Sequence, residues 1–406
     1  MAPGELGRGL ARVAKWPRAP LGRLLRLEYG KGLTASQRDA SGPFPVAGSN
    51  GPNGTHSDAL VTGPGIVVGR KGSAGKVYWY DTDFWPIDTT YYVVPKLPLD
   101  MRWAYYLLRQ LRLEQLATTT GVPGLNRNDA YRLEVPYPLL SEQRRIVAIL
   151  DHADRLRRLR AAADAKADRI LPALFGKMFG DPATNPKGFD ALPLGDRRLG
   201  VLDRGRSRHR PRNDPSLLGG PHPLIQTGDV ARCDGRIRNY SQTYSDLGLS
   251  QSKMWPAGTL CITIAANIAN TGVLEFDACF PDSVVGFVPG AKATTEYVQF
   301  FLWFLQPLLE RTAPHAAQKN INLEILRDLP CPLPPRELQD KFSMRVREHY
   351  AARRHQIESR ERLESLFANM GLRGFTGALT ASWREDHMDD LLQEMEHQAK
   401  ALAETH

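Results

Sequence analysis

Basic and amide side chains recur in the first half of the sequence at positions where the chain is expected to turn. They are Lys31, Ser49, Asn50, Arg70, Lys71, Lys76, Asn126, Arg127 and Asn128. Lysine and arginine neutralise phosphates, and side-chain amides can donate to and accept from the edge of adenine. Each residue alone is typical of a solvated surface or a turn. Together they predict a surface that binds DNA.

The second half carries a comparable set of polar side chains. Between Arg197 and Arg212 the sequence has seven arginines, with His209 and Pro211 among them. Such an extended basic run predicts a flexible phosphate clamp, whose affinity would fall steeply with salt. From this run and the polar segments after it, we take as candidate DNA contacts Arg206, Arg208, Thr227, Asn267, Gln318, Lys319, Asn320 and Asn322.

The two sets belong to an internal repeat. Asn126-Arg127-Asn128 is followed by Pro136-Tyr137-Pro138-Leu139 and then a helical pattern, and Asn320-Ile321-Asn322 is followed by Pro330-Cys331-Pro332-Leu333 and another helical pattern. A repeat of this length is one globular domain plus one helix. A duplicated binding domain joined by helices suits a long, repeating ligand, and double-stranded DNA is the obvious candidate.

Short strands and long helices must position these residues. Gly65–Gly69, Lys76–Tyr80 and Thr89–Val94 have the β-branched and aromatic composition of strands. Ser141 then opens a stretch to about Ile170 without glycine or proline, in which apolar residues recur every three or four positions. This amphipathic helix is too rich in alanine and arginine to be stable alone, so it should pair with another, and Pro172 should end or kink it.

A second long helix is predicted from Arg336 to about Met370. We expect the two helices to pack antiparallel as a coiled-coil spacer between two globular, β-rich α/β domains, an α+β fold. The predicted division is a flexible leader at 1–20, a first DNA-binding domain at 21–140, a first spacer helix at 141–180, a second domain at 181–335, a second spacer helix at 336–380 and an acidic tail at 381–406.

Composition narrows the class of protein. The 406 residues are 42% hydrophobic with no apolar run long enough to span a bilayer, which argues against disorder and membrane insertion. A formal net charge of +9 favours a polyanionic partner. The four cysteines show no metal-ligand spacing and are expected to be buried free thiols in a reducing cytoplasm.

Enzyme signatures are missing. The Gly69–Lys76 loop resembles a phosphate cradle but lies between two predicted strands, and Val77 stands where a nucleotide-binding loop needs serine or threonine. Asp181-Pro182 and Asn185-Pro186 lack the second proline of an adenine methyltransferase clamp, and Pro281-Asp282 lacks the acid-x-Lys of a metal-dependent nuclease. We therefore expect no catalysis and no bound cofactor or metal in this chain.

Several motifs, in order, resemble the target recognition domains of type I restriction-modification specificity subunits. In the first domain these are Gly30–Thr34, Gly48–Gly51, Gly69–Ser73, Trp85–Thr90 and Pro123–Arg127; in the second, Thr227–Asp229, Ala266–Ile268 and Gln318–Leu323. Ser141–Val147, Met178–Pro182 and Asn185–Gly188 are similar to that family's spacer helix. The chain departs from the family pattern at Arg336-Glu337-Leu338-Gln339, at Pro172 and in the acidic tail.

The resemblance implies a non-catalytic reader of DNA. Each domain would enter the major groove at one half of a split, asymmetric site, and the helices would fix the unread gap and bind two methylation subunits. S-adenosylmethionine, ATP and magnesium would reside on those subunits and on motor/nuclease subunits. The alternatives are a solitary DNA-binding protein of the same fold, a nuclease or methyltransferase in its own right, and a purely structural scaffold.

Overall fold

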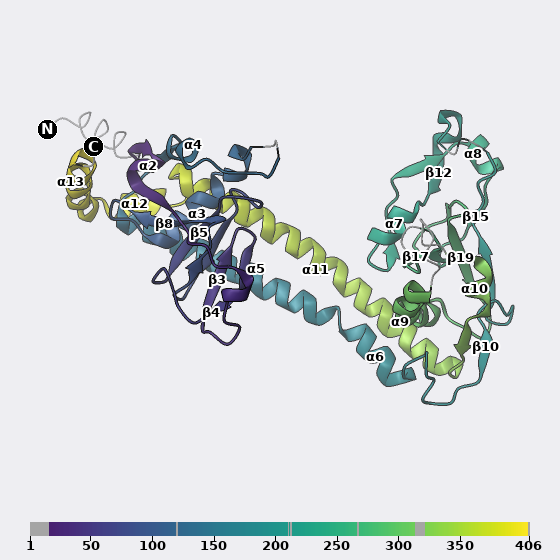
Figure 1. Ribbon diagram of the computed structural model, residues 1–406. Helices are drawn as coiled ribbons and strands as arrows, with labels where there is room; N and C mark the ends of the chain where they lie inside the picture. Colours follow the sequence, from purple (N-terminus) through teal and green to yellow (C-terminus); the bar gives the residue numbers. More distant parts are fainter. Residues whose placement is uncertain are drawn as a thin grey trace. The chain divides into compact units, whose positions relative to one another are not determined.

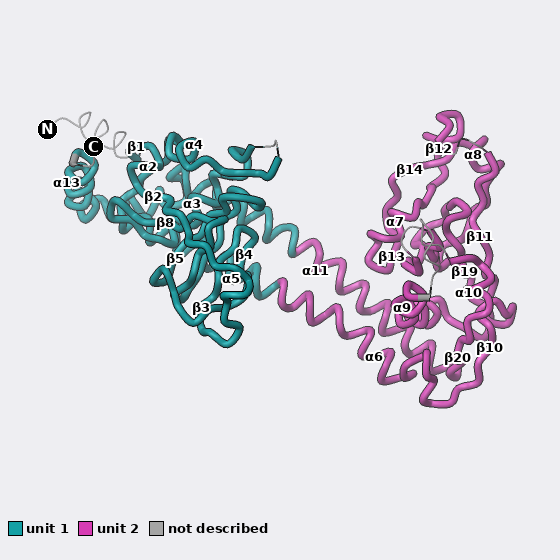
Figure 2. The backbone as a smooth tube through the Cα atoms, in the orientation of Figure 1, with its two compact units in different colours: residues 1–160, 360–406 teal, residues 161–359 magenta. Residues whose placement is uncertain are grey.

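The computed structural model describes residues 16–118, 121–209, 211, 213–265, 268–312 and 321–404. It has two compact units, one drawn from residues 1–160 and 360–406 and the other from residues 161–359 (Figure 2). Each unit combines β-sheets with helices (Figure 1). The α+β class with two β-rich domains is therefore confirmed, and the chain passes from one unit to the other within long helices.

The main sheet of the first unit is antiparallel, with strand order β2-β8-β5-β6. A smaller sheet has the order β4-β3-β7, and β1 pairs with β9. The strands are β1 (Arg18–Pro20), β2 (Leu25–Tyr29), β3 (Phe44–Gly48), β4 (Gly51–His56), β5 (Gly65–Gly69), β6 (Val77–Tyr80), β7 (Trp85–Pro86), β8 (Thr90–Pro95) and β9 (Glu134–Pro136). The helices are α2 (Leu21–Leu24), η1 (Ala35–Gln37), α3 (Met101–Gln110), η2 (Leu113–Leu116) and α4 (Arg127–Tyr131).

The second unit repeats this plan. Its main sheet has the order β11-β19-β16-β17-β13, its second sheet the order β14-β12-β18-β15, and β10 pairs with β20. The strands are β10 (Ala191–Pro193), β11 (Gly200–Arg204), β12 (Leu218–Leu224), β13 (Arg236–Ile237), β14 (Gln242–Tyr244), β15 (Met254–Trp255), β16 (Leu260–Thr263), β17 (Thr271–Leu274), β18 (Ala278–Cys279), β19 (Val284–Pro289) and β20 (Pro330–Pro332). The helices are η3 (Pro215–Leu217), α7 (Thr227–Arg232), α8 (Asp246–Ser250), α9 (Thr295–Thr312) and α10 (Leu323–Asp328).

The predicted long helices are α5 (Leu140–Ala167) followed by α6 (Ile170–Phe179), and α11 (Arg336–Thr376). The helix breaks at Asp168 and Arg169, ahead of Pro172. Pro172 therefore lies in the first turn of α6, where an amide has no acceptor within the helix and its loss costs nothing.

Contacts within the second unit show that these helices run antiparallel. Asp168, between α5 and α6, pairs with Arg353 of α11. In the second unit, the Phe179 ring at the end of α6 lies 5.4 Å from the ring of Phe342 near the start of α11. Later residues of one segment meet earlier residues of the other, as the coiled-coil prediction requires.

The C-terminal residues form α12 (Ala381–Asp386) and α13 (Met388–Glu404), which pack on the first unit. Glu142, only 1% exposed, accepts hydrogen bonds from Trp16 and Thr380 and pairs with Arg384 at 3.0 Å. Glu394 of α13 accepts from the amide of Ser141 at the start of α5. The predicted acidic tail is thus structured where described, and its carboxylate lies at a helix N-terminus, where negative charge is favourable.

Each unit has its own apolar core, built around Trp103 in the first and around Phe175, Tyr297 and Phe342 in the second. All four cysteines are free thiols, and three of them are buried. Among the described helices, none is long and apolar enough to cross a membrane.

Candidate nucleic-acid interface

An exposed aromatic ring stands between two arginines in the first unit. Tyr29, the last residue of β2, is 51% exposed. The guanidinium of Arg127 lies 4.7 Å from its ring centre and that of Arg70 5.3 Å from it. Both arginines are anchored to the backbone, Arg127 by donating to the Leu27 carbonyl at 3.1 Å and Arg70 to that of Asp88 at 2.9 Å. The structure therefore brings two predicted contacts together and adds Tyr29, which the sequence analysis missed.

Lys31 lies beside this group. Its ammonium is 5.9 Å from the centre of the Trp85 ring, whose Nε1 donates to the Lys31 carbonyl at 3.0 Å. The Lys31 amide donates to the Pro86 carbonyl at 2.9 Å. A Cβ on the preceding Gly30 would lie 2.2 Å from the Ile87 carbonyl oxygen, so only glycine allows this approach. Trp85 thus helps to hold a cation at the surface.

The Gly69–Lys76 loop joins two strands, as predicted. The Gly69 amide donates to the Lys76 carbonyl at 2.8 Å, and Lys71 forms a bridge with Gly124. Lys71 and Lys76 are exposed. A Cβ on Gly72 would lie 3.5 Å from Ser49 Oγ, which puts the Ser49-Asn50 turn against the loop. The loop does not feed a helix, so it lacks the helix N-terminus that a nucleotide-binding loop uses.

The second unit reproduces the setting of Lys31 at Arg206. The Arg206 amide donates to the Phe280 carbonyl at 3.1 Å, and the amide of the preceding Gly205 donates to the Val284 carbonyl. A Cβ on Gly205 would lie 2.3 Å from the Phe280 oxygen. Both cations therefore follow an obligatory glycine at the end of the first strand of their sheet, and Arg206 is exposed, as Lys31 is.

Ser49 and Thr227 are also equivalent. Val46 pairs in parallel with Trp85, and Leu224 pairs in parallel with Cys279. Ser49 stands three residues after Val46, in a tight turn. Thr227 stands three residues after Leu224 and is the first residue of α7. One strand exit thus leads to two different local structures.

The loops after β5 and β16 form the next equivalent pair. The Arg70 carbonyl accepts from Leu125 at 2.9 Å, and the Ile264 carbonyl accepts from Ile321 at 3.1 Å. The Thr263 amide donates to Asn270, as Gly69 does to Lys76. Asn267 belongs to this second loop, but it lies outside the described residues, as do Gln318, Lys319 and Asn320.

These bonds correct the register of the repeat. Asn126 caps α4 and accepts from the Asn128 amide at 3.0 Å, and Asn322 caps α10 and accepts from the Ile325 amide at 2.8 Å. Asn126 is therefore equivalent in the repeat to Asn322, and not to Asn320 as the proline motifs suggested. The oxygen of each cap already accepts one backbone hydrogen bond, and its NH2 group can donate to another partner.

The arginine run is described in part. The Arg208 amide donates to Gln251 Oε1 at 2.6 Å, and its side chain is exposed. Arg210 and Arg212 lie outside the described residues. Nearby, the Lys253 ammonium lies 3.8 Å from the centre of the Trp255 ring, a second cation held on an aromatic face and one that the sequence analysis did not select.

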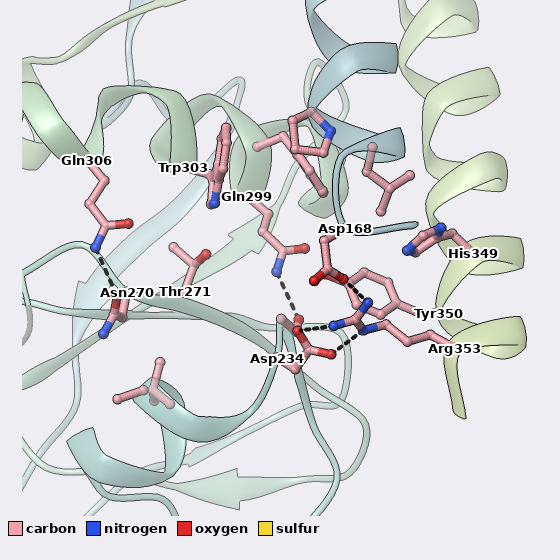
Figure 3. Close-up of a pocket in the computed structure, with 16 residues that line it drawn as sticks. Asp168, Asp234, Asn270, Thr271, Gln299, Trp303, Gln306, His349, Tyr350 and Arg353 are labelled. Carbon is pink, nitrogen blue, oxygen red and sulfur yellow. Dashed lines mark hydrogen bonds and ion pairs between the residues drawn. The ribbon is translucent and has the colours of Figure 1, made fainter. Parts of the chain in front are cut away.

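A cavity of about 400 Å³ lies in the second unit (Figure 3). Across it, Arg353 of α11 pairs with Asp168 and Asp234, and Gln306 of α9 donates to Asn270 Oδ1 at 2.9 Å. These ion pairs connect α11 to Asp168, between α5 and α6, and to Asp234 of the second β-rich domain. Among the described residues no group of three or more histidines, cysteines or carboxylates could hold a metal ion.

The sequence matches the family model of the type I restriction modification DNA specificity domain twice, over residues 15–165 and 208–360. It is 26% identical over 144 residues to the type I restriction enzyme EcoprrI specificity subunit of Escherichia coli, covering 34% of this chain and 36% of that protein. It is 22% identical over 271 residues to the putative type I restriction enzyme MjaX specificity subunit of Methanocaldococcus jannaschii, covering 62% of each. The matches thus span less than two thirds of these relatives.

The fold is similar to that of the type I restriction-modification S subunit from M. genitalium, with a TM-score of 0.62 at 17% identity, covering 89% of this chain and 96% of that one. A chain from a study of complex assembly and conformational transition of the type I R-M system gives 0.55 at 17% identity, covering 90% and 98%. The two family matches cover most of the sequence. The chain therefore belongs to the type I restriction-modification DNA specificity family.

Proposed function

We propose that this chain reads DNA sequence for a type I restriction-modification complex. The observation that carries the proposal is the repeated placement of candidate contacts. Lys31 and Arg206 occupy one shared position, Ser49 and Thr227 a second, and Asn126 and Asn322 a third. A backbone frame that presents polar side chains at the same places in two domains suits double-stranded DNA, which has the same groove geometry at two sites along its length.

The two domains would read different half-sites. Arg70 at the exit of β5 corresponds to Ile264 at the exit of β16, and Tyr29 at the end of β2 corresponds to Arg204 at the end of β11. A guanidinium can bond guanine or phosphate, whereas isoleucine offers only apolar contact. An asymmetric, bipartite DNA site follows, with the spacer helices setting the unread gap.

Catalysis would belong to other chains. Two methylation subunits with S-adenosylmethionine would dock on the helices, and motor/nuclease subunits would use ATP and magnesium. The support from this chain is the nature of its candidate interface, which is cationic, amide-bearing and aromatic. Such groups bind phosphates and base edges.

Methylation mapping tests the proposal. The gene is deleted in its host, and N6-methyladenine is mapped along the genome by long-read sequencing. We expect one split, asymmetric motif to lose methylation in both halves and to regain it when the gene is restored. If genomic methylation is unchanged by the deletion while the purified chain binds duplex DNA in vitro, the solitary DNA-binding protein would be favoured.

A further inference from the structure

The contact between each reading domain and its spacer helix starts from the same glutamine clamp. Gln143 Oε1 accepts from the Asp100 amide at 2.8 Å, and its Nε2 donates to the Pro138 carbonyl at 2.8 Å. Gln339 Oε1 accepts from the Thr294 amide at 3.0 Å, and its Nε2 donates to the Pro334 carbonyl at 2.9 Å. These bonds make Asp100 equivalent to Thr294, and Gln143 equivalent to Gln339.

An ion pair follows at matching positions, with its charges exchanged. In the first unit, Arg102 stands two residues after the clamped amide and Asp151 eight residues after the glutamine. In the second unit, Glu296 and Arg347 stand at the same two positions. Arg102 Nε lies 2.8 Å from Asp151 Oδ1 in the first unit. In the second, Arg347 Nε lies 3.1 Å from Glu296 Oε1. The domain is positive and the helix negative in one unit, and the reverse holds in the other.

The surroundings of each pair reinforce its polarity. Arg102 lies 4.8 Å from the centre of the Trp79 ring and 5.3 Å from that of Tyr106, and the Tyr106 hydroxyl donates to Asp151 at 2.6 Å. Aromatic faces favour a cation there. The Glu296 side chain is 5% exposed and pairs with a second arginine, Arg236, at 3.1 Å.

The helix–helix contact supplies an internal comparison. Arg157 stands fourteen residues after Gln143 and pairs with Glu364, and Arg353 stands fourteen residues after Gln339 and pairs with Asp168. Here the arginine and the acid keep their places in both units. The charges are therefore exchanged at the joint between domain and helix but not at this helix–helix contact.

We infer that the exchanged ion pairs match each reading domain to its own spacer helix. Placed against the other helix, Arg102 would face Arg347 and Glu296 would face Asp151. The Arg102 and Glu296 side chains are 18% and 5% exposed, so a like charge placed beside either of them would be unfavourable. The pairs would thus disfavour packing of either domain on the wrong helix. If the chain reads DNA as proposed, they would fix which domain lies at which end of the split site.

The full chain carrying Asp151→Arg with Arg347→Asp tests this inference, because it mismatches both joints and leaves the net charge unchanged. The matched control is Asp151→Asn with Arg347→Gln, which removes both pairs without opposing like charges. We expect the exchanged chain to have an unfolding equilibrium constant about tenfold or more above that of the neutral chain. Thermal and denaturant unfolding without DNA give the readout, so the result is independent of the proposed function.

A second variant keeps the test decisive if the exchanged chain fails to fold. Arg102→Glu combined with Asp151→Arg gives the first unit the polarity of the second. We expect it to recover most of the stability lost by either single change, although the ring contacts of Arg102 are not replaced. An exchanged chain as stable as the neutral control, or a double variant no better than its worse single variant, would overturn the inference.

Discussion

The two β-rich domains share a backbone frame and differ in the side chains that the frame presents. Glycine holds the turn before Lys31 and before Arg206, and a glutamine clamps the helix after each domain. Yet Arg70 corresponds to Ile264. The difference teaches that backbone hydrogen bonds and close contacts fix where a candidate contact residue stands, whereas its side chain differs between the two domains.

A second difference lies at the start of the spacer helices. The residue before the glutamine is the buried Glu142 in the first unit and Leu338 in the second, where it packs against the apolar core. Glu142 binds Arg384 of the C-terminal helices. A carboxylate is tolerated there because the C-terminal segment supplies its partners, whereas the second unit closes the same place with an aliphatic side chain.

Substituting the shared glycines is the strongest way to break the common frame. Gly30→Ala and Gly205→Ala would each force a Cβ within 2.2 and 2.3 Å, respectively, of a backbone oxygen. We expect a loss of about 3 kcal/mol or more in unfolding free energy for each, since a backbone carbonyl cannot move aside as a side chain can. Denaturant unfolding gives the measurement.

Gly32→Ala is the matched control for this prediction, because no atom lies within 4 Å of the added Cβ. Stability of Gly30→Ala equal to that of the control would show that the turn before Lys31 is not built as described.

Removing the glutamine clamp tests whether the two joints are equivalent. Gln143→Leu would leave the Asp100 amide without its acceptor, while the Pro138 carbonyl keeps a hydrogen bond from Gln398. Gln339→Leu would remove the acceptor of the buried Thr294 amide and the donor to the Pro334 and Lys292 carbonyls. We expect both variants to be destabilised, Gln143→Leu by about 1 kcal/mol and Gln339→Leu by about 2 kcal/mol. Thermal unfolding of the two variants side by side gives the measurement, and no loss in either variant would contradict the clamp in that unit.

The sequence predicted the frame better than the site. Alternating strand patterns and the long helical repeat located β5, α5 and α11, because those signals are local. The cation positions Lys31 and Arg206 were selected separately, and only tertiary hydrogen bonds reveal that they are equivalent. The proline motifs misled the repeat register by two residues, since β9 and β20 are aligned by their pairing with β1 and β10 and not by resemblance of sequence.

Tyr29 shows why the rest could not be predicted. It follows an ordinary strand pattern, and nothing in its neighbours along the chain marks it. Tyr29 is exposed only because of how the domain folds around it, and the two arginines at its ring belong to segments far away in sequence. Conversely, Asn126 and Asn322 were selected as free amide forks, and the structure shows that their oxygens cap helices.

Truncating the arginines beside Tyr29 should affect one half-site only. With the duplex identified by methylation mapping, Arg127→Ala should weaken binding by about 1 to 2 kcal/mol and flatten the salt dependence by one phosphate contact. Fluorescence anisotropy at several salt concentrations gives both quantities. Arg132→Ala is the control, because Arg132 is 81% exposed and pairs with Asp129. Equal losses for the two variants would remove Arg127 from the interface.

The smallest expected effect concerns pH and the charge-exchanged joint. Burial alone would raise the pKa of Glu296, but hydrogen bonds from Arg347 and Arg236 outweigh it and lower the pKa below the ordinary value of 4.5. A lowered folded-state pKa means that the stabilisation is complete above about pH 4.5 and is lost as the pH falls through the folded-state value. Unfolding free energies measured between pH 6 and pH 3 should therefore decline less steeply in Glu296→Gln than in the unsubstituted chain, because the variant lacks the titrating group. Parallel curves for the two proteins would mean that the second joint gains nothing from its charge, leaving the exchanged polarity without an energetic consequence in that unit.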